Sequence, residues 1–116
     1  QLTSTSEERM REELLIDASI NDTIVKYAQN TRAAGLDGVV CSPLEAGMVH
    51  GACGEEFLTV TPGVRFADGD VADQVRVTTP ARAREIGSDL IVVGRPITAA
   101  EDPVAAYRRC VAEFVG

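Results

Sequence analysis

The chain has 116 residues, of which 45% are hydrophobic and 25% charged, a composition that favours a folded domain over a disordered chain. Its formal net charge of −7 disfavours nucleic acid and anionic membrane surfaces as partners, and no apolar run approaches the roughly 20 residues of a membrane span. Three cysteines without Cys-x-x-Cys spacing indicate buried or idle thiols in a reducing cytoplasm, and the lone His50 offers no ligand cluster for a metal site or a catalytic triad.

Strands and helices alternate along the chain at short spacing. Ser6 is a predicted N-cap, because the acidic residues that suit a helix N-terminus follow it. Further helices are predicted over residues 21–34, 42–49, 79–87 and 103–114. Short apolar runs predict strands over residues 38–41, 57–61 and 90–93.

The pattern of these elements favours one fold class. The run at residues 38–41 is typical of a parallel strand that is covered on both faces. No Gly-x-Gly-x-x-Gly motif follows any strand, so a dinucleotide-binding fold has no support. We therefore predict the back half of a (β/α)8 barrel, with residues 1–116 as one α/β domain. Because the first three residues resemble the end of a strand, we expect a fragment that lacks the N-terminal half of the barrel.

Two strand exits carry residues suited to an anion. Gly94 and Arg95 follow the strand at 90–93, where a backbone without Cβ allows close approach and a guanidinium supplies a fork of donors. Arg65 follows the preceding strand after Pro62 and Gly63. In barrels of this kind the loops after the last two strands often bind phosphate, so we predict one shared pocket. Residues 63–78 form a polar loop long enough to be functional.

Five stretches resemble the bacterial branch of the orotidine 5′-phosphate decarboxylases in their order and spacing. They are residues 2–6, 35–42, 59–65, 73–74 together with 78–80, and 93–98. The resemblance covers essentially the whole chain and implies the C-terminal half of the family's barrel, strands five to eight with their helices. It also implies the conversion of orotidine monophosphate to uridine monophosphate and carbon dioxide, without metal or organic cofactor.

The resemblance implies a role for each matching residue. Thr3 would lie beside the pyrimidine, and Gln74 would reach between the phosphate and the base as a latch. Arg65 would contact the substrate, while Gly94 and Arg95 would hold its phosphate. The chemistry suits these roles, because an uncharged glutamine can both donate to a phosphate and accept from a base.

One feature of the family is missing from the sequence. Family members carry an Asp-x-Lys-x-x-Asp array whose lysine protonates the carbanion left by carbon dioxide, and no such spacing occurs here. The only lysine, Lys26, falls in the middle of a predicted helix, where a solvated surface lysine is expected. We therefore expect no catalytic residue in this chain and no activity of the chain alone.

Two other functions remain open. The chain could be half of a related barrel that acts on another sugar phosphate, in which case Thr3 and Gln74 would have no pyrimidine to contact. It could also be a half-barrel that oligomerises without a ligand. Unpaired strand edges and an uncovered interior face, to which Val40, Val60 and Val92 contribute, predict self-association as a homodimer or a larger assembly.

Overall fold

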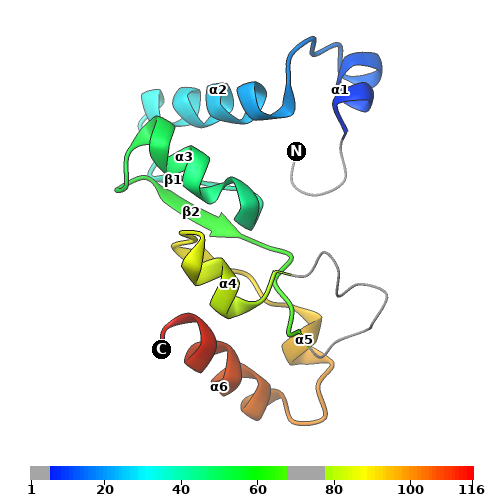
Figure 1. Cartoon of the computed structure of the whole chain (residues 1–116), viewed down its shortest axis with the longest axis vertical. Helices are drawn as coiled ribbons and strands as arrows, with labels where there is room; N and C mark the ends of the chain where they lie inside the picture. Colours follow the sequence, from blue (N-terminus) through cyan, green and yellow to red (C-terminus); the bar gives the residue numbers. More distant parts are fainter. Residues whose placement is uncertain (1–5, 68–77) are drawn as a thin grey trace.

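Three short parallel strands form the sheet of the computed structural model, which describes residues 6–67 and 78–116 (Figure 1). The strands are β1 (Gly38–Val40), β2 (Leu58–Thr61) and β3 (Leu90–Ile91), in the order β1-β2-β3. The helices are α1 (Glu7–Glu13), α2 (Ile20–Ala33), α3 (Ala46–Cys53), α4 (Pro80–Glu85), α5 (Arg95–Thr98) and α6 (Pro103–Phe114), with a 3-10 turn η1 (Pro43–Glu45) before α3. This alternation of parallel strands and helices is the predicted α/β fold.

Side chains at the helix ends explain where the helices begin. Ser6 caps α1 by accepting a hydrogen bond from the Arg9 N–H, as predicted. Thr79 and Asp102 cap α4 and α6 in the same way. The short helix α5 was not predicted, and it begins where we expected only a loop after a longer strand. The strand predicted over residues 90–93 is limited to Leu90–Ile91.

The hydrophobic core lies where α2 and α3 pack against the strands. Its buried members are Ile24, Ala28, Cys41, Val49, Cys53 and Phe57. All three cysteines are buried free thiols, so the prediction that they are buried is confirmed. No helix in the described ranges is long and apolar enough to cross a membrane.

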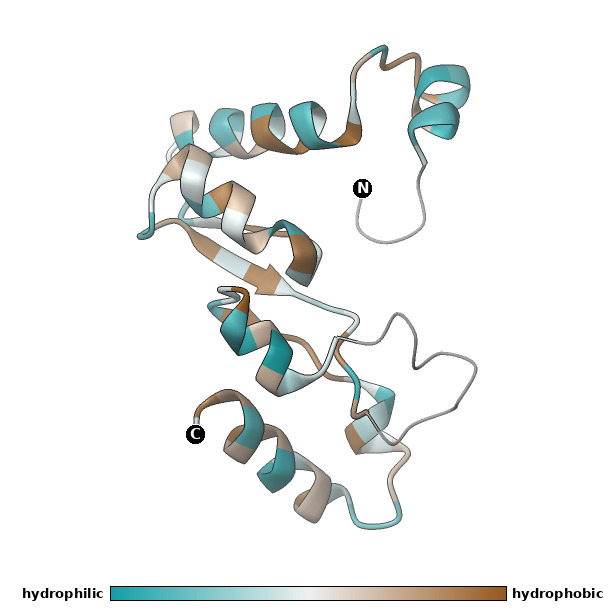
Figure 2. Ribbon diagram, viewed as in Figure 1, coloured by the Kyte–Doolittle hydropathy of each residue, from teal (hydrophilic) through white to brown (hydrophobic). Residues whose placement is uncertain are grey.

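The two faces of the sheet differ in burial. Thr59 and Thr61 on β2 are fully buried, whereas Val40 is 56% exposed and its neighbour across the sheet, Val60, is partly buried. The alternation along β2 is visible as bands of differing hydropathy (Figure 2). The prediction that β1 is covered on both faces is therefore wrong. Among the described residues, the helices cover only the sheet face that carries Thr59 and Thr61.

The exposed face is continuous across the three strands. Val40 pairs with Val60, and Val60 pairs with Leu90. Because side chains alternate along a strand, Val92 lies on the same side as Leu90, and each of the two is 51% exposed. Val40, Val60 and Val92 thus share one apolar face, as predicted. We call Val40, Leu58, Val60, Leu90 and Val92 the open sheet face.

Candidate anion-binding site

The carboxyl ends of β2 and β3 lie side by side. Thr61 pairs with Ile91 in parallel register, and the N–H of Val92 donates to the carbonyl oxygen of Thr61 at 3.0 Å. Pairing therefore continues to the last residue of β2. Because parallel strands end at the same edge of a sheet, the loops that carry Arg65 and Arg95 start from neighbouring points.

Gly94 is the N-cap residue of α5. Its carbonyl oxygen accepts hydrogen bonds from the N–H groups of Ile97 at 2.9 Å and Thr98 at 3.0 Å. A Cβ atom built on Gly94 would meet no heavy atom within 4 Å, so the space beside this backbone is open. A ligand atom can approach the backbone there, which is the property predicted for this glycine.

Arg95 begins α5, and its side chain is exposed. Within the part of the chain that the structure describes, its guanidinium forms no hydrogen bond or ion pair. An acidic neighbour therefore does not occupy it there, and all its donors remain available to an anion. This arrangement differs from that of Arg82 and Arg109, which pair with the glutamates Glu85 and Glu113 on their own helices.

Arg65 is an exposed residue whose backbone is fixed on both sides. Its N–H donates to the carbonyl oxygen of Thr78 at 3.0 Å. The preceding residue, Val64, forms a parallel bridge with Thr78, and both are almost completely buried. The predicted loop over residues 63–78 thus has a structured base, which holds Arg65 close to the start of α4.

Two of the predicted ligand residues, Thr3 and Gln74, lie outside the described residues, as does the strand end expected at Thr3. Of the five predicted ligand residues, the structure places the other three together: Gly94 and Arg95 lie at the same sheet edge as the loop of Arg65. Lys26 is exposed on α2, as predicted. Among the described residues, no group of three or more His, Cys, Asp or Glu side chains could hold a metal ion.

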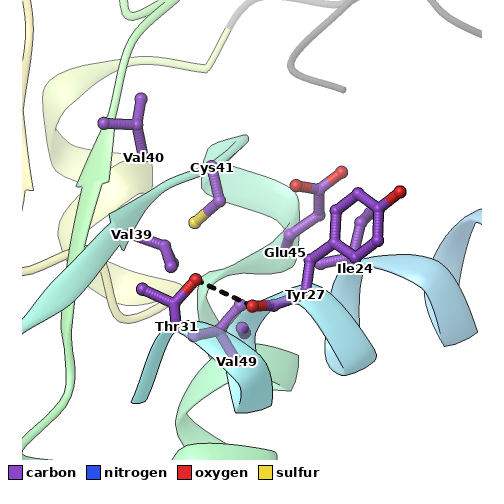
Figure 3. A pocket seen from close by; sticks show the side chains of 9 residues that line it. Ile24, Tyr27, Thr31, Val39, Val40, Cys41, Glu45 and Val49 are labelled. Atoms are coloured by element: carbon purple, nitrogen blue, oxygen red, sulfur yellow. Dashed lines mark hydrogen bonds between the residues drawn. The ribbon is translucent and has the colours of Figure 1, made fainter. Parts of the chain in front are cut away.

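Away from this edge, a hollow lies between α2 and the edge of β1 (Figure 3). It has a volume of about 250 Å³ and is lined mostly by apolar side chains, with Cys41 and Glu45 among them. Burial, with smaller contributions from the charges of Glu45 and Asp89, raises the pKa of the Cys41 thiol to about 11. The thiol is therefore protonated near neutrality and is a poor nucleophile. Without a cationic side chain, this hollow does not suit a phosphate.

His50, the single histidine of the sequence, lies on α3. It is buried, and its Nε2 atom lies 2.7 Å from Oδ2 of Asp89. Asp89 precedes β3 and was not singled out in the sequence. The pair lies at the amino end of the strands, away from the anion-binding edge, so its role is structural.

Comparison with known proteins agrees with this geometry. Residues 1–110 match the family described as "Orotidine 5'-phosphate decarboxylase / HUMPS family". The chain belongs to this family. It is 53% identical over 116 residues to an orotidine 5′-phosphate decarboxylase of Bacillus cereus (strain AH187), and it covers 49% of that protein. The chain thus spans about half the length of the curated relatives it matches.

Solved structures show the same relationship. The crystal structure of orotidine 5′-phosphate decarboxylase from Lactobacillus acidophilus matches with a TM-score of 0.85 and 41% identity, over 100% of this chain and 47% of that one. An uncharacterized conserved protein from Geobacillus kaustophilus matches with a TM-score of 0.81 and 41% identity, over 98% of this chain and 46% of that one. Because the family's fold is a (β/α)8 barrel, the chain corresponds to about half of one, which confirms the predicted fold class.

Proposed function

We propose that the chain carries the phosphate-binding edge of an orotidine 5′-phosphate decarboxylase. The observation that carries the proposal is the exposed guanidinium of Arg95, next to the open backbone of Gly94 and on the same sheet edge as the loop of Arg65. Such a site can hold a phosphate against the chain's net charge of −7, because the contacts are local and directional.

The proposed substrate is orotidine monophosphate, and the proposed product is uridine monophosphate. Gly94 and Arg95 hold the phosphate, and Arg65 contacts the substrate from the neighbouring loop. Thr3 beside the pyrimidine and Gln74 as a latch belong to the same proposal. Phosphate binding away from the reacting carbon gives the enzyme binding energy that can serve the chemical step.

The reaction itself requires groups that this sequence lacks. No Asp-x-Lys-x-x-Asp spacing occurs in it, so the chain holds the substrate without supplying the proton donor. We therefore propose that the whole enzyme decarboxylates orotidine monophosphate and that this chain alone does not. The family assignment also favours a single folded unit and a cytoplasmic location.

We further propose a second copy of the chain as a partner. The open sheet face is apolar, and within the described residues β1 and β3 each pair on one side only. Two copies that pair the edge of β1 with the edge of β3 would cover these faces and satisfy the strand edges. The result would be a homodimer or a larger closed assembly.

Titration of the chain with nucleotides and sugar phosphates tests the proposed substrate class. We expect uridine monophosphate to bind more tightly than ribose 5-phosphate, and ribose 5-phosphate to bind about as well as inorganic phosphate. The alternative is the related sugar-phosphate enzyme that the sequence left open. Equal binding of uridine monophosphate and ribose 5-phosphate would favour that alternative, and binding of none of the three would overturn the proposal.

A further inference from the structure

Phe66, the residue after Arg65, contacts α6, a helix that is distant in the sequence. The ring centroid of Phe66 lies 4.0 Å from Cζ of Arg109 on α6, a cation–π contact. The Nε–H of Arg109 donates to Oε2 of Glu113 at 2.8 Å, one helical turn further on. Because Glu113 fixes the guanidinium plane, Arg109 offers the Phe66 ring an oriented surface.

The residue before Arg65, Val64, and the Arg65 N–H both contact Thr78. Val64 forms the bridge with Thr78, and the N–H of Arg65 donates to the Thr78 carbonyl oxygen at 3.0 Å. The backbone of Arg65 is therefore held between two contacts, the bridge on its amino side and the Phe66 ring on its carboxyl side. Neither of these two contacts involves the guanidinium of Arg65, because they are made by the backbone and by the Phe66 ring.

The helix that receives Phe66 also supports the second arginine of the site. α6 packs against α5, and α5 begins with Arg95. One helix thus contacts both loops that leave the carboxyl ends of β2 and β3 (Figure 1). Two arginines on separate loops bind one anion well only if the loops are fixed relative to each other, because ordering them on binding would cost affinity.

We propose that Phe66 and Arg109 are positioning residues of the anion site, which hold the Arg65 loop at a fixed place relative to Arg95. This inference rests on the proposed function, since it requires both arginines to serve one phosphate. Arg109 acts through Phe66 and does not contact the ligand. Lysine would be a poorer residue at position 109, because it lacks the planar guanidinium that stacks on the ring.

The test measures the dissociation constants of uridine monophosphate and inorganic phosphate for variants of the 116-residue chain. We expect Phe66→Leu and Arg109→Gln each to raise the dissociation constants of both ligands about 2- to 10-fold. The double variant should be no weaker than the worse single variant, because each change breaks the same contact. Phe66→Tyr, which keeps the ring, should bind as the wild type does.

Arg108→Gln is the matched control, because it removes one positive charge from an exposed position of the same helix. We expect it to bind as the wild type does. Equal losses in Arg108→Gln and Arg109→Gln would overturn the proposal, since charge alone would then explain them. A loss for uridine monophosphate without a loss for inorganic phosphate would also overturn it, because the pair would then act on the nucleoside.

Amide hydrogen exchange separates this proposal from the one on which it rests. The Arg65 amide should exchange faster in Phe66→Leu and Arg109→Gln than in the wild type. Its exchange rate should be unchanged in Arg108→Gln. If the wild type binds neither ligand, the proposed function is overturned, and the exchange rates still decide whether the pair fixes the loop. Unchanged exchange in both variants would show that it does not.

Discussion

The Nε2 atom of His50 lies 2.7 Å from the Oδ2 atom of Asp89, and this contact joins α3 to the start of β3. The same carboxylate oxygen accepts hydrogen bonds from the N–H of Thr59 at 2.8 Å and from its hydroxyl group at 3.0 Å. One carboxylate therefore connects α3, β2 and β3. His50 and Thr59 are both buried, so bulk water could not replace the Asp89 carboxylate as their hydrogen-bond partner if it were removed.

Removal of this carboxylate should destabilise the fold. We expect Asp89→Ala to lower the free energy of unfolding by about 1–3 kcal/mol, because buried donors lose their acceptor. Urea denaturation followed by circular dichroism measures the change. Asp37→Ala, at an exposed aspartate before β1, is the control and should change the stability by no more than about 0.5 kcal/mol. Equal losses in the two variants would contradict this account.

The contribution of Asp89 should depend on pH. Burial alone would raise the pKa of Asp89, but hydrogen bonds from Thr59 and His50 outweigh it and hold the pKa below the ordinary value of 3.8. A carboxyl group with a lowered pKa in the folded state stabilises the fold above its unfolded pKa and loses that effect as the pH falls. The stability difference between the wild type and Asp89→Ala should therefore shrink as the pH falls below about 3.8. A difference that grows in acid would be the opposite of this expectation.

Local signals in the sequence explain which parts of the fold could be predicted. The helix at Pro103–Phe114 was predicted at its observed bounds, because Pro103 suits a helix start and the apolar spacing marks its length. The apolar run of β1 was misread as covered on both faces, because a short apolar run does not reveal whether one or two layers cover it, whereas the open face followed from the expectation of half a barrel. The α5 helix was missed because its four residues are too few for a periodic pattern.

In the site, too, residues with a local sequence signal could be predicted and contacts between distant residues could not. Gly94 and Arg95 could be proposed from the sequence because a glycine and an arginine directly follow the predicted strand, which is a local signal. The contacts between His50 and Asp89 and between Phe66 and Arg109 join residues far apart in the sequence, so no spacing rule reveals them. The resemblance to the family supplied Thr3 and Gln74, and their roles stay predictions.

The open sheet face should cause self-association. We expect sedimentation at micromolar concentration to show dimers or larger species, because apolar surface and strand edges are costly in water. Val92→Glu should shift the chain toward the monomer, because it places a charge on that face. Leu36→Glu, at an exposed position before β1, is the control and should leave the association unchanged. A monomeric wild type whose unfolding does not depend on concentration would contradict the prediction.

The purified chain should not decarboxylate orotidine monophosphate. The charged array that protonates the carbanion is absent from its sequence, and the loss of such a group removes many orders of magnitude in rate. Conversion to uridine monophosphate can be followed by absorbance. A polypeptide that carries the family's Asp-x-Lys-x-x-Asp array should restore activity when it is mixed with this chain. Turnover by the chain alone would show that another group supplies the proton.

The most direct test of the phosphate-binding edge compares Arg95→Ala with Lys26→Ala, since each variant removes one positive charge and both residues are exposed. Isothermal titration with uridine monophosphate gives the two dissociation constants. We predict that Arg95→Ala weakens binding by about 1.5–3 kcal/mol, or roughly 10- to 150-fold, because it removes a charge-assisted contact. Lys26→Ala should bind as the wild type does. Equal weakening in the two variants would show that the nucleotide is held by net charge and not at the ends of β2 and β3.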